Sequence, residues 1–75
     1  MDVQILYFAD LRERRGSDRE VRTVDPGTTI GGLFDQIFPD HRGSVACTRN
    51  QAIVPPDTVL EDGDEVSFLP PLGGG

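Results

Sequence analysis

The chain ends in a segment that could carry chemistry at the terminus itself, Pro70-Pro71-Leu72-Gly73-Gly74-Gly75. A globular domain rarely closes on three glycines, because glycine loses the most backbone entropy on ordering and has no side chain to bury. The two prolines fix φ and block a continuing helix or sheet, so they favour a semi-rigid outward projection. The tail follows the apolar stretch 66–69 without a polar spacer. We therefore expect a projecting tail that places the terminal carboxylate inside a narrow site of a partner protein. A frayed end or a linker remnant is the alternative.

Few other side chains have residues close in sequence with which they could form a catalytic or metal-binding site. Cys47 lies within an expected strand with no base close in sequence, so a small buried hydrophobe is preferred over a nucleophile. His41 stands in a polar loop without a second histidine or a nearby Cys/Asp cluster, so we expect no metal or catalytic role. The arginines of 9–16 are interpreted as a solvated face, with binding of an acidic group as the alternative. We expect no metal site.

Length and charge limit the classes of protein that are possible. The chain has 75 residues, a net charge of −6 and one cysteine, so we expect one domain without an internal disulfide. No stretch is apolar enough to span a membrane and no signal-peptide pattern is present, so the expected compartment is the cytoplasm. The acidic charge disfavours nucleic acid and favours a partner with a basic surface. All seven basic side chains are arginine, so the chain presents no lysine amine.

The elements that would position the tail follow from periodicity and turn residues. A helix capped by Thr28 or Thr29 and stopped by Pro39 would carry one apolar stripe: Ile30, Leu33, Phe34, Ile37 and Phe38. We expect a helical turn over 9–16 and strands over 3–8, 17–24, 45–49, 52–54 and 65–69, the last one central. This order predicts an α+β, β-grasp roll: a mixed sheet of four to five strands packed on one main helix. The domain would cover 1–69, with a flexible, extended tail over 70–75.

Alternation along the strands leaves one sheet face without a cover. Val3, Ile5, Tyr7, Val66 and Phe68 would meet the helix, and Leu6, Phe8 and Leu69 would face water with Ile53 nearby. A soluble monomer seldom exposes such a cluster without using it, so we expect a docking surface; partial cover by loops is the alternative. Within the helix, Gly31 and Gly32 indicate either a close approach to the sheet or simple tolerance.

Three stretches together carry a family resemblance. They are Leu6-Tyr7-Phe8-Ala9-Asp10-Leu11-Arg12-Glu13 followed by Gly16, the turn Asn50-Gln51, and Leu60 to Pro71 followed by two residues and Gly74-Gly75. Their content and spacing resemble the small subunit of molybdopterin synthase, the MoaD family of the ubiquitin-like MoaD/ThiS superfamily. The resemblance covers essentially the whole chain.

The resemblance implies a sulfur carrier that supplies no catalytic side chain of its own. An E1-like, MoeB-like enzyme would use ATP to adenylate the carboxylate of Gly75. A sulfur donor protein would then allow conversion to a thiocarboxylate, which gives sulfur to the molybdopterin dithiolene inside a MoaE-like large subunit. By position, Gly75 bears the sulfur, 70–74 form the inserted tail, and Phe8, Ile53 and Leu69 form the docking surface. No cofactor would be bound permanently.

Two departures and three alternatives accompany this interpretation. Gly73 replaces a more usual small polar or β-branched residue, which raises the ordering entropy lost on insertion. Arg49 puts a charge beside the Asn50 turn, where it could alter partner choice. The alternatives are a small archaeal modifier conjugated to target lysines, a ThiS-like carrier of the thiamin pathway, and a non-covalent binding module. The Phe68 to Pro71 end favours the molybdenum branch. Because the tail length matches the family, Gly75 is expected to be the genuine terminus.

Overall fold

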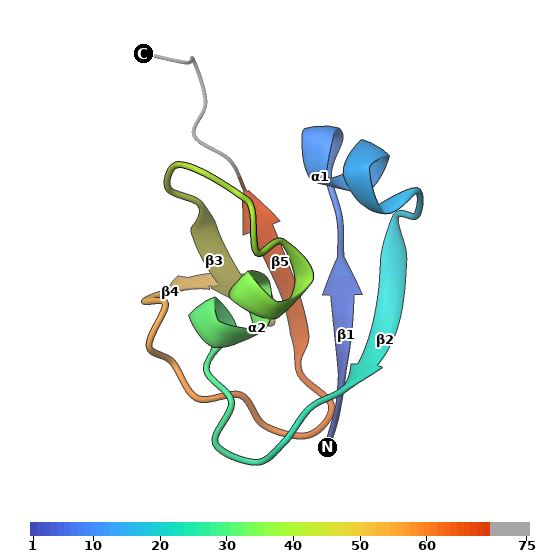
Figure 1. The fold of residues 1–75 in the computed structure, drawn as a ribbon. Coiled ribbons are helices and arrows are strands. Elements are labelled where there is room, and N and C mark those ends of the chain that lie inside the picture. Colours follow the sequence, from blue (N-terminus) through green and yellow to red (C-terminus); the bar gives the residue numbers. More distant parts are fainter. Residues whose placement is uncertain (70–75) are drawn as a thin grey trace.

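The computed structural model describes residues 1–69, and the expectations for 70–75 lie outside that part of the chain. Its elements, in order, are β1 (Asp2–Leu6), α1 (Ala9–Arg15), β2 (Arg19–Thr23), α2 (Ile30–Ile37), β3 (Ala46–Arg49), β4 (Ala52–Val54) and β5 (Glu65–Leu69). The strands form one sheet in the order β2-β1-β5-β3-β4, with α2 lying across one of its faces (Figure 1). The predicted α+β, β-grasp architecture is confirmed, including the central position of β5.

The pairing of β1 with β5 fixes which segments meet at one end of the sheet. These two strands run parallel, whereas β2 is antiparallel to β1, and β3 is antiparallel to both β4 and β5. Parallel strands finish at the same edge of a sheet. The chain therefore leaves β1 at Leu6, opposite Ser67 of β5, so that Phe8 and Leu69 follow at the same edge, with α1 at the same end of the molecule (Figure 1).

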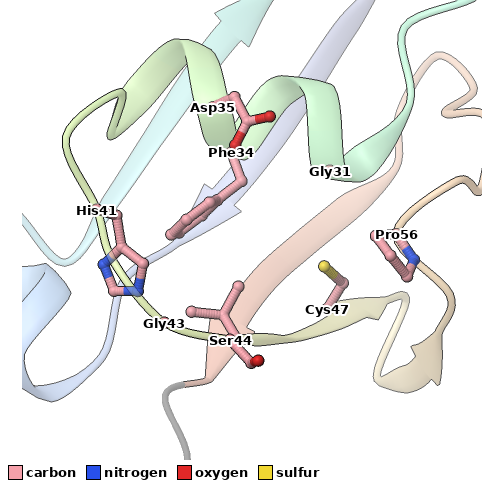
Figure 2. A pocket seen from close by; sticks show the side chains of 9 residues that line it. Gly31, Phe34, Asp35, His41, Gly43, Ser44, Cys47 and Pro56 are labelled. Carbon is pink, nitrogen blue, oxygen red and sulfur yellow. The ribbon is translucent and has the colours of Figure 1, made fainter.

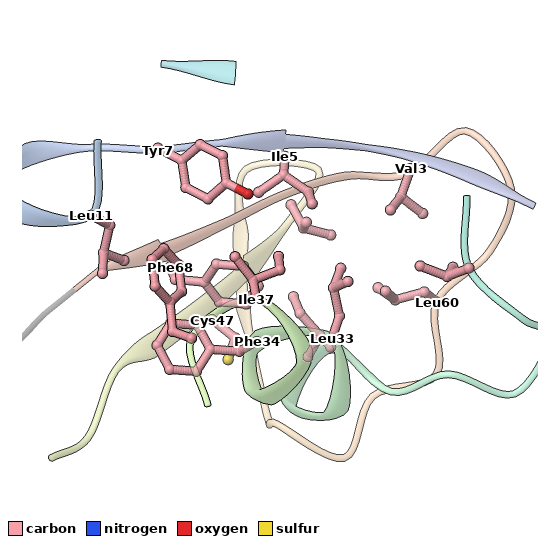
Figure 3. Packing of buried hydrophobic residues seen from close by; sticks show 14 residues of the cluster. Val3, Ile5, Tyr7, Leu11, Leu33, Phe34, Ile37, Cys47, Leu60 and Phe68 are labelled. Carbon is pink, nitrogen blue, oxygen red and sulfur yellow. The ribbon is translucent and has the colours of Figure 1, made fainter. Parts of the chain in front are cut away.

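The core lies between α2 and the sheet face that carries the odd-numbered residues of β1. The side chain of Thr29 caps α2 by accepting a 3.0 Å hydrogen bond from the backbone N–H of Gly32. Side chains from β1 and β5 point toward α2 and enclose an apolar centre (Figure 3). All five residues of the predicted stripe are buried, together with Val3, Ile5, Tyr7, Leu11, Val24, Cys47, Leu60, Val66 and Phe68.

Gly31 is required by a loop. A Cβ built at this position would lie 2.9 Å from the carbonyl oxygen of Pro56, and the Gly31 N–H donates a 2.8 Å hydrogen bond to that same oxygen. The expected close approach is therefore real, but it is made by the segment after β4. Of the two explanations that the sequence left open, a close approach to the sheet and simple tolerance, neither names this loop.

The arginines of α1 are exposed, as expected, yet two of them also attach α1 to the rest of the domain. Arg15 donates to both carboxylate oxygens of Glu20 at 3.1 Å, and Arg14 lies 3.0 Å from Nδ1 of His41. Glu20 also accepts a 2.6 Å hydrogen bond from the hydroxyl of Tyr7. These contacts join α1 to β2 and to the loop after α2.

Within residues 1–69, no helix combines the length and the apolar character needed to cross a membrane.

Candidate partner-binding surface

The face of the sheet opposite α2, which we call the open face, carries the predicted docking residues. Residues opposite one another in a ladder share a face of the sheet. One row across the open face consists of Leu6, Ser67, Thr48 and Ile53. Phe8, Ile53 and Leu69 are 45%, 75% and 37% exposed, which is unusual for large apolar side chains and leaves them available for contact.

The open face is hollowed where β1, β5 and β3 meet. The hollow measures about 330 Å³ and is lined by Leu6, Phe8, Thr48, Gln51, Glu65, Val66, Ser67 and Leu69. The structure thus brings Phe8 and Leu69 together, as the sequence predicts. Ile53 shares the open face, opposite Thr48 on the outer strand β4, but does not line the hollow.

Polar residues of the hollow were missed by the sequence analysis. The hydroxyls of Thr48 and Ser67 are hydrogen-bonded to each other between the apolar side chains, and Gln51 and Glu65 stand at the edge nearest the β3–β4 turn. Alternation from Leu69 along β5 was sufficient to place Ser67 and Glu65 on this face. Thr48 and Gln51 could be found only once β3 was known to pair with β5.

The backbone holds Phe8 firmly in position. Phe8 is extended, with φ −125° and ψ 153°, and its carbonyl accepts from the N–H groups of Leu11 and Arg12. The next residue, Ala9, has a φ of 49°, in the left-handed region that costs a non-glycine residue about 1–2 kcal/mol. The chain thus turns sharply into α1 directly after Phe8, which lines the hollow together with Leu69.

The β3–β4 turn is held against the start of β5. Asn50 and Gln51 both have positive φ, 52° and 72°, as a two-residue type I′ hairpin turn requires. The Asn50 N–H donates to the Glu65 carbonyl at 2.7 Å, and the Glu65 N–H donates to the Asn50 side-chain oxygen at 3.0 Å. Gln51 is thereby fixed beside Glu65 at the hollow.

Arg49 serves a structural role on the α2 side of the sheet. Its Nε lies 3.0 Å from Oδ2 of the buried Asp64, and its Nη2 lies 3.0 Å from Oε2 of Glu61. Burial tends to raise the pKa of Asp64, but hydrogen bonds from the Glu61 N–H and the Asn50 amide, together with Arg49, lower the pKa overall. Because the charge of Arg49 is used within the chain, nothing on the open face supports the hypothesis that it alters partner choice.

A second hollow, of about 340 Å³, lies beside α2 and holds the two other candidate residues (Figure 2). Cys47 is buried in its wall, and this burial raises the pKa of the thiol, as expected for an inert core cysteine. His41 lies at the other end, edge-on to Phe34 with ring centroids 5.0 Å apart. No hydrogen bond joins the two residues in the described chain, and no cluster of three His, Cys, Asp or Glu between residues 1 and 69 could hold a metal ion.

A five-stranded mixed sheet on one main helix, with an exposed apolar face beside the end of its central strand, defines the class of ubiquitin-like β-grasp proteins. A family profile described as "ThiS family" matches residues 5–75. A molybdopterin synthase sulfur carrier subunit of Mycobacterium tuberculosis is 44% identical, with 97% of this chain and 96% of the relative covered. The chain belongs to the ThiS family, and its curated relatives are molybdopterin synthase sulfur carrier subunits.

Solved structures share this fold over the whole chain. A putative molybdopterin converting factor, subunit 1, of Pyrococcus furiosus is 27% identical with a TM-score of 0.83, covering 96% of this chain and 99% of that one. SAMP1 of Haloferax volcanii is 25% identical with a TM-score of 0.80 and full coverage of both chains. The fold also occurs, at 22% identity, a TM-score of 0.65 and full coverage of both chains, in a complex of subunits 1 and 2 of the Helicobacter pylori molybdopterin-converting factor.

Proposed function

We propose that this chain is the sulfur carrier subunit of a molybdopterin synthase, acting in the cytoplasm. The observation that carries the proposal is the 44% identity, over 97% of the chain, to a relative with that name. The open face supports it, because a carrier without a catalytic side chain must act through the proteins that hold it. Its fold provides an apolar surface for such proteins next to the strand that leads into 70–75.

The proposed chemistry is located at the carboxylate of Gly75. A carboxylate is a poor electrophile, so an E1-like enzyme first transfers AMP from ATP to it, with pyrophosphate as the leaving group. Sulfur that a donor protein supplies at the oxidation level of sulfide then displaces AMP and leaves a thiocarboxylate, an anionic nucleophile at neutral pH. Glycine has no Cβ to obstruct the approach of the enzyme to this carbonyl. ATP belongs to the activating enzyme, and the carrier itself needs no permanently bound cofactor.

The open face is the proposed docking site for both partners. Phe8, Leu69 and Ile53 would contact the large, MoaE-like subunit, and residues 70–74 would enter its active site. The same face would meet the E1-like, MoeB-like activating enzyme at a different stage. The Helicobacter pylori complex supports a large-subunit partner, since a protein of this fold is present there with its subunit 2.

Intact mass spectrometry tests the chemistry. The full chain is incubated with ATP, an E1-like activating enzyme and a sulfur donor, and a variant without Gly75 is the control. The expected result is a mass gain equal to the exchange of one oxygen for sulfur, located at Gly75 by fragmentation and absent in the control. No gain, with an activating enzyme shown to work on another carrier, would contradict the proposal.

A variant of Phe8 tests the docking surface separately. Truncation of a hot-spot anchor in an interface costs about 2 kcal/mol or more, so Phe8→Ala should weaken binding to the large subunit by about thirtyfold if Phe8 is such an anchor. Val59→Ala is the matched control, because Val59 is 52% exposed and lies in the segment between β4 and β5, away from the hollow. Equal effects of the two substitutions would argue against docking through the open face.

Conjugation to proteins is the second candidate function, and the likeness to SAMP1, a small archaeal modifier protein, favours it. The activated Gly75 would then form an isopeptide bond with a lysine amine of a target protein, releasing AMP. The chain has no lysine, so it cannot form chains on itself through that residue. Mass spectrometry of tryptic digests of proteins captured with the tagged chain would reveal target lysines that carry the peptide 50–75, because no Lys or Arg follows Arg49, and none if the carrier role is the only one.

A further inference from the structure

The hollow on the open face contains a carboxylate that the fold itself does not use. Glu65 begins the central strand β5, and its side chain lines the hollow with Leu6 and Leu69. The salt bridges found among residues 1–69 involve only Glu20, Glu61 and Asp64 as acids, so Glu65 has no ionic partner there. A half-buried carboxylate next to apolar side chains is best stabilised by an opposite charge from outside the chain.

The other polar side chains of the hollow are a hydrogen-bonded hydroxyl pair and the exposed amide of Gln51. Thr48 and Ser67 bond to each other through their hydroxyls, which uses one of the two O–H donors and leaves the other for a partner or for water. The Gln51 side chain, by contrast, stands beside Glu65 with no hydrogen bond in the described part of the chain. Its amide oxygen and the Glu65 carboxylate are two side-chain acceptors at this end of the hollow for which no hydrogen bond is found among residues 1–69.

The conformation of Gln51 supports a role for its side chain. With a φ of 72°, Gln51 occupies the second position of a type I′ turn, where glycine is favoured and another residue costs about 1 kcal/mol. Nothing in the turn itself requires glutamine. The position therefore retains an amide side chain at the hollow in spite of that cost.

We propose that this hollow is a subsite for one arginine side chain of the docking partner. The guanidinium would donate to the Glu65 carboxylate and the Gln51 amide oxygen, and the aliphatic stem would lie over the Thr48–Ser67 pair, between Leu6 and Leu69. Arginine fits better than lysine, because its planar fork reaches two acceptors at once and it is less strongly hydrated. A basic side chain also matches the net charge of −6.

The subsite rests on the proposed function for the identity of the partner, the large synthase subunit. Along β5, Glu65 and Leu69 are four residues apart on one face, or about 13 Å at 3.3 Å per residue. The arginine would occupy the Glu65 half of the hollow and an apolar partner residue would occupy the half next to Phe8. The surface thus combines a charged and an apolar contact, which fixes the orientation of the partner.

Calorimetric titration of the large subunit of the same organism with the full chain tests this inference, at low and at high salt. Glu65→Gln should weaken binding about tenfold at low salt and make it less dependent on salt than binding of the parent chain. Glu65→Arg should weaken it further through repulsion. Glu13→Gln, on the exposed surface of α1, is the matched control and should bind as the parent chain does. Thermal unfolding of each variant shows that the fold is retained.

The outcomes separate the subsite from the proposed function. Unchanged binding of Glu65→Gln at both salt concentrations, with a loss for Phe8→Ala, would overturn the subsite and leave the carrier function standing. If the parent chain itself neither binds the large subunit nor gains sulfur, both fail. A double-mutant cycle with each interface arginine of the large subunit should find one that is coupled to Glu65. Coupling to a lysine alone would overturn the assignment to arginine.

Discussion

Asp64→Asn should destabilise the domain more than its small change in structure suggests. Asp64 is 5% exposed, and its carboxylate accepts from the Glu61 N–H at 2.8 Å, the Asn50 amide at 3.2 Å and Arg49 Nε at 3.0 Å. Asparagine retains one oxygen but turns an NH₂ group toward one of these donors. A hydrogen bond to a charged group contributes about 1.5–3 kcal/mol, so we expect a loss of about 3 kcal/mol at neutral pH.

That loss should be large in a thermal unfolding experiment. A change of 1 kcal/mol shifts Tm by about 4–8 °C in a domain of this size, so circular dichroism should show a decrease of roughly 10–20 °C. Asp57→Asn is the matched control, because Asp57 is exposed and has no hydrogen bond or ion pair in residues 1–69. It should change stability by less than about 0.5 kcal/mol.

The pH dependence gives a second, independent measurement. The pKa of Asp64 is lowered in the folded state, whereas an unfolded aspartate has a pKa of about 3.9. The carboxylate therefore contributes its stabilisation above about pH 4 and loses it as the pH falls through the folded-state pKa. The difference between the parent chain and Asp64→Asn should narrow below pH 4. A difference that stays constant with pH, or an equal loss in Asp57→Asn, would refute the argument.

Three further predictions concern stability. Tyr7→Phe should cost about 1 kcal/mol, because Glu20 loses the Tyr7 hydroxyl as a donor. Burial and the hydrogen bond to Glu20 raise the pKa of Tyr7 to about 12. Phenolate absorbance should therefore not develop near pH 10 while the chain stays folded. The free energy of unfolding should fall as the pH rises from about 10 to 12. Gly31→Ala should lower the free energy of unfolding in urea by about 1–2 kcal/mol despite better helix propensity, since its Cβ would meet the Pro56 carbonyl at 2.9 Å. An unchanged urea midpoint would show that the loop around Pro56 moves to make room for the Cβ. Gln51→Gly should raise stability by about 1 kcal/mol while weakening partner binding, and a variant weaker in both would contradict the assigned turn strain.

Local sequence patterns were sufficient to predict the structure where interactions between residues close in the chain determine it. The stripe at 30, 33, 34, 37 and 38 follows from the helical period. Thr29 marks a helix start through its side-chain oxygen, and Pro39 and Gly16 mark helix ends through their backbone conformation. Alternation placed Leu6, Phe8 and Leu69 on the face opposite the helix, which the structure confirms.

The contacts of Gly31 and Arg49 were beyond such patterns, because their partners lie elsewhere in the chain. Pro56 approaches Gly31 from the segment after β4, and Asp64 reaches Arg49 from the turn before β5. The sequence identified an unusual glycine and an unexpected charge. For the glycine it offered only a close approach to the sheet or simple tolerance, and for the charge only an effect on partner choice.

The sequence by itself determined the β-grasp class, the two faces of its sheet and the position of the tail after the central strand, since each depends on periodicity and turn residues along a continuous segment. Only the tertiary structure decided that Leu6, Gln51 and Glu65 line one hollow with Phe8 and Leu69. That arrangement depends on the pairing of β3 and β1 with β5, which is set by packing of the whole sheet on α2 and by long-range hydrogen bonds. Side chains far apart in sequence meet only when these contacts have formed.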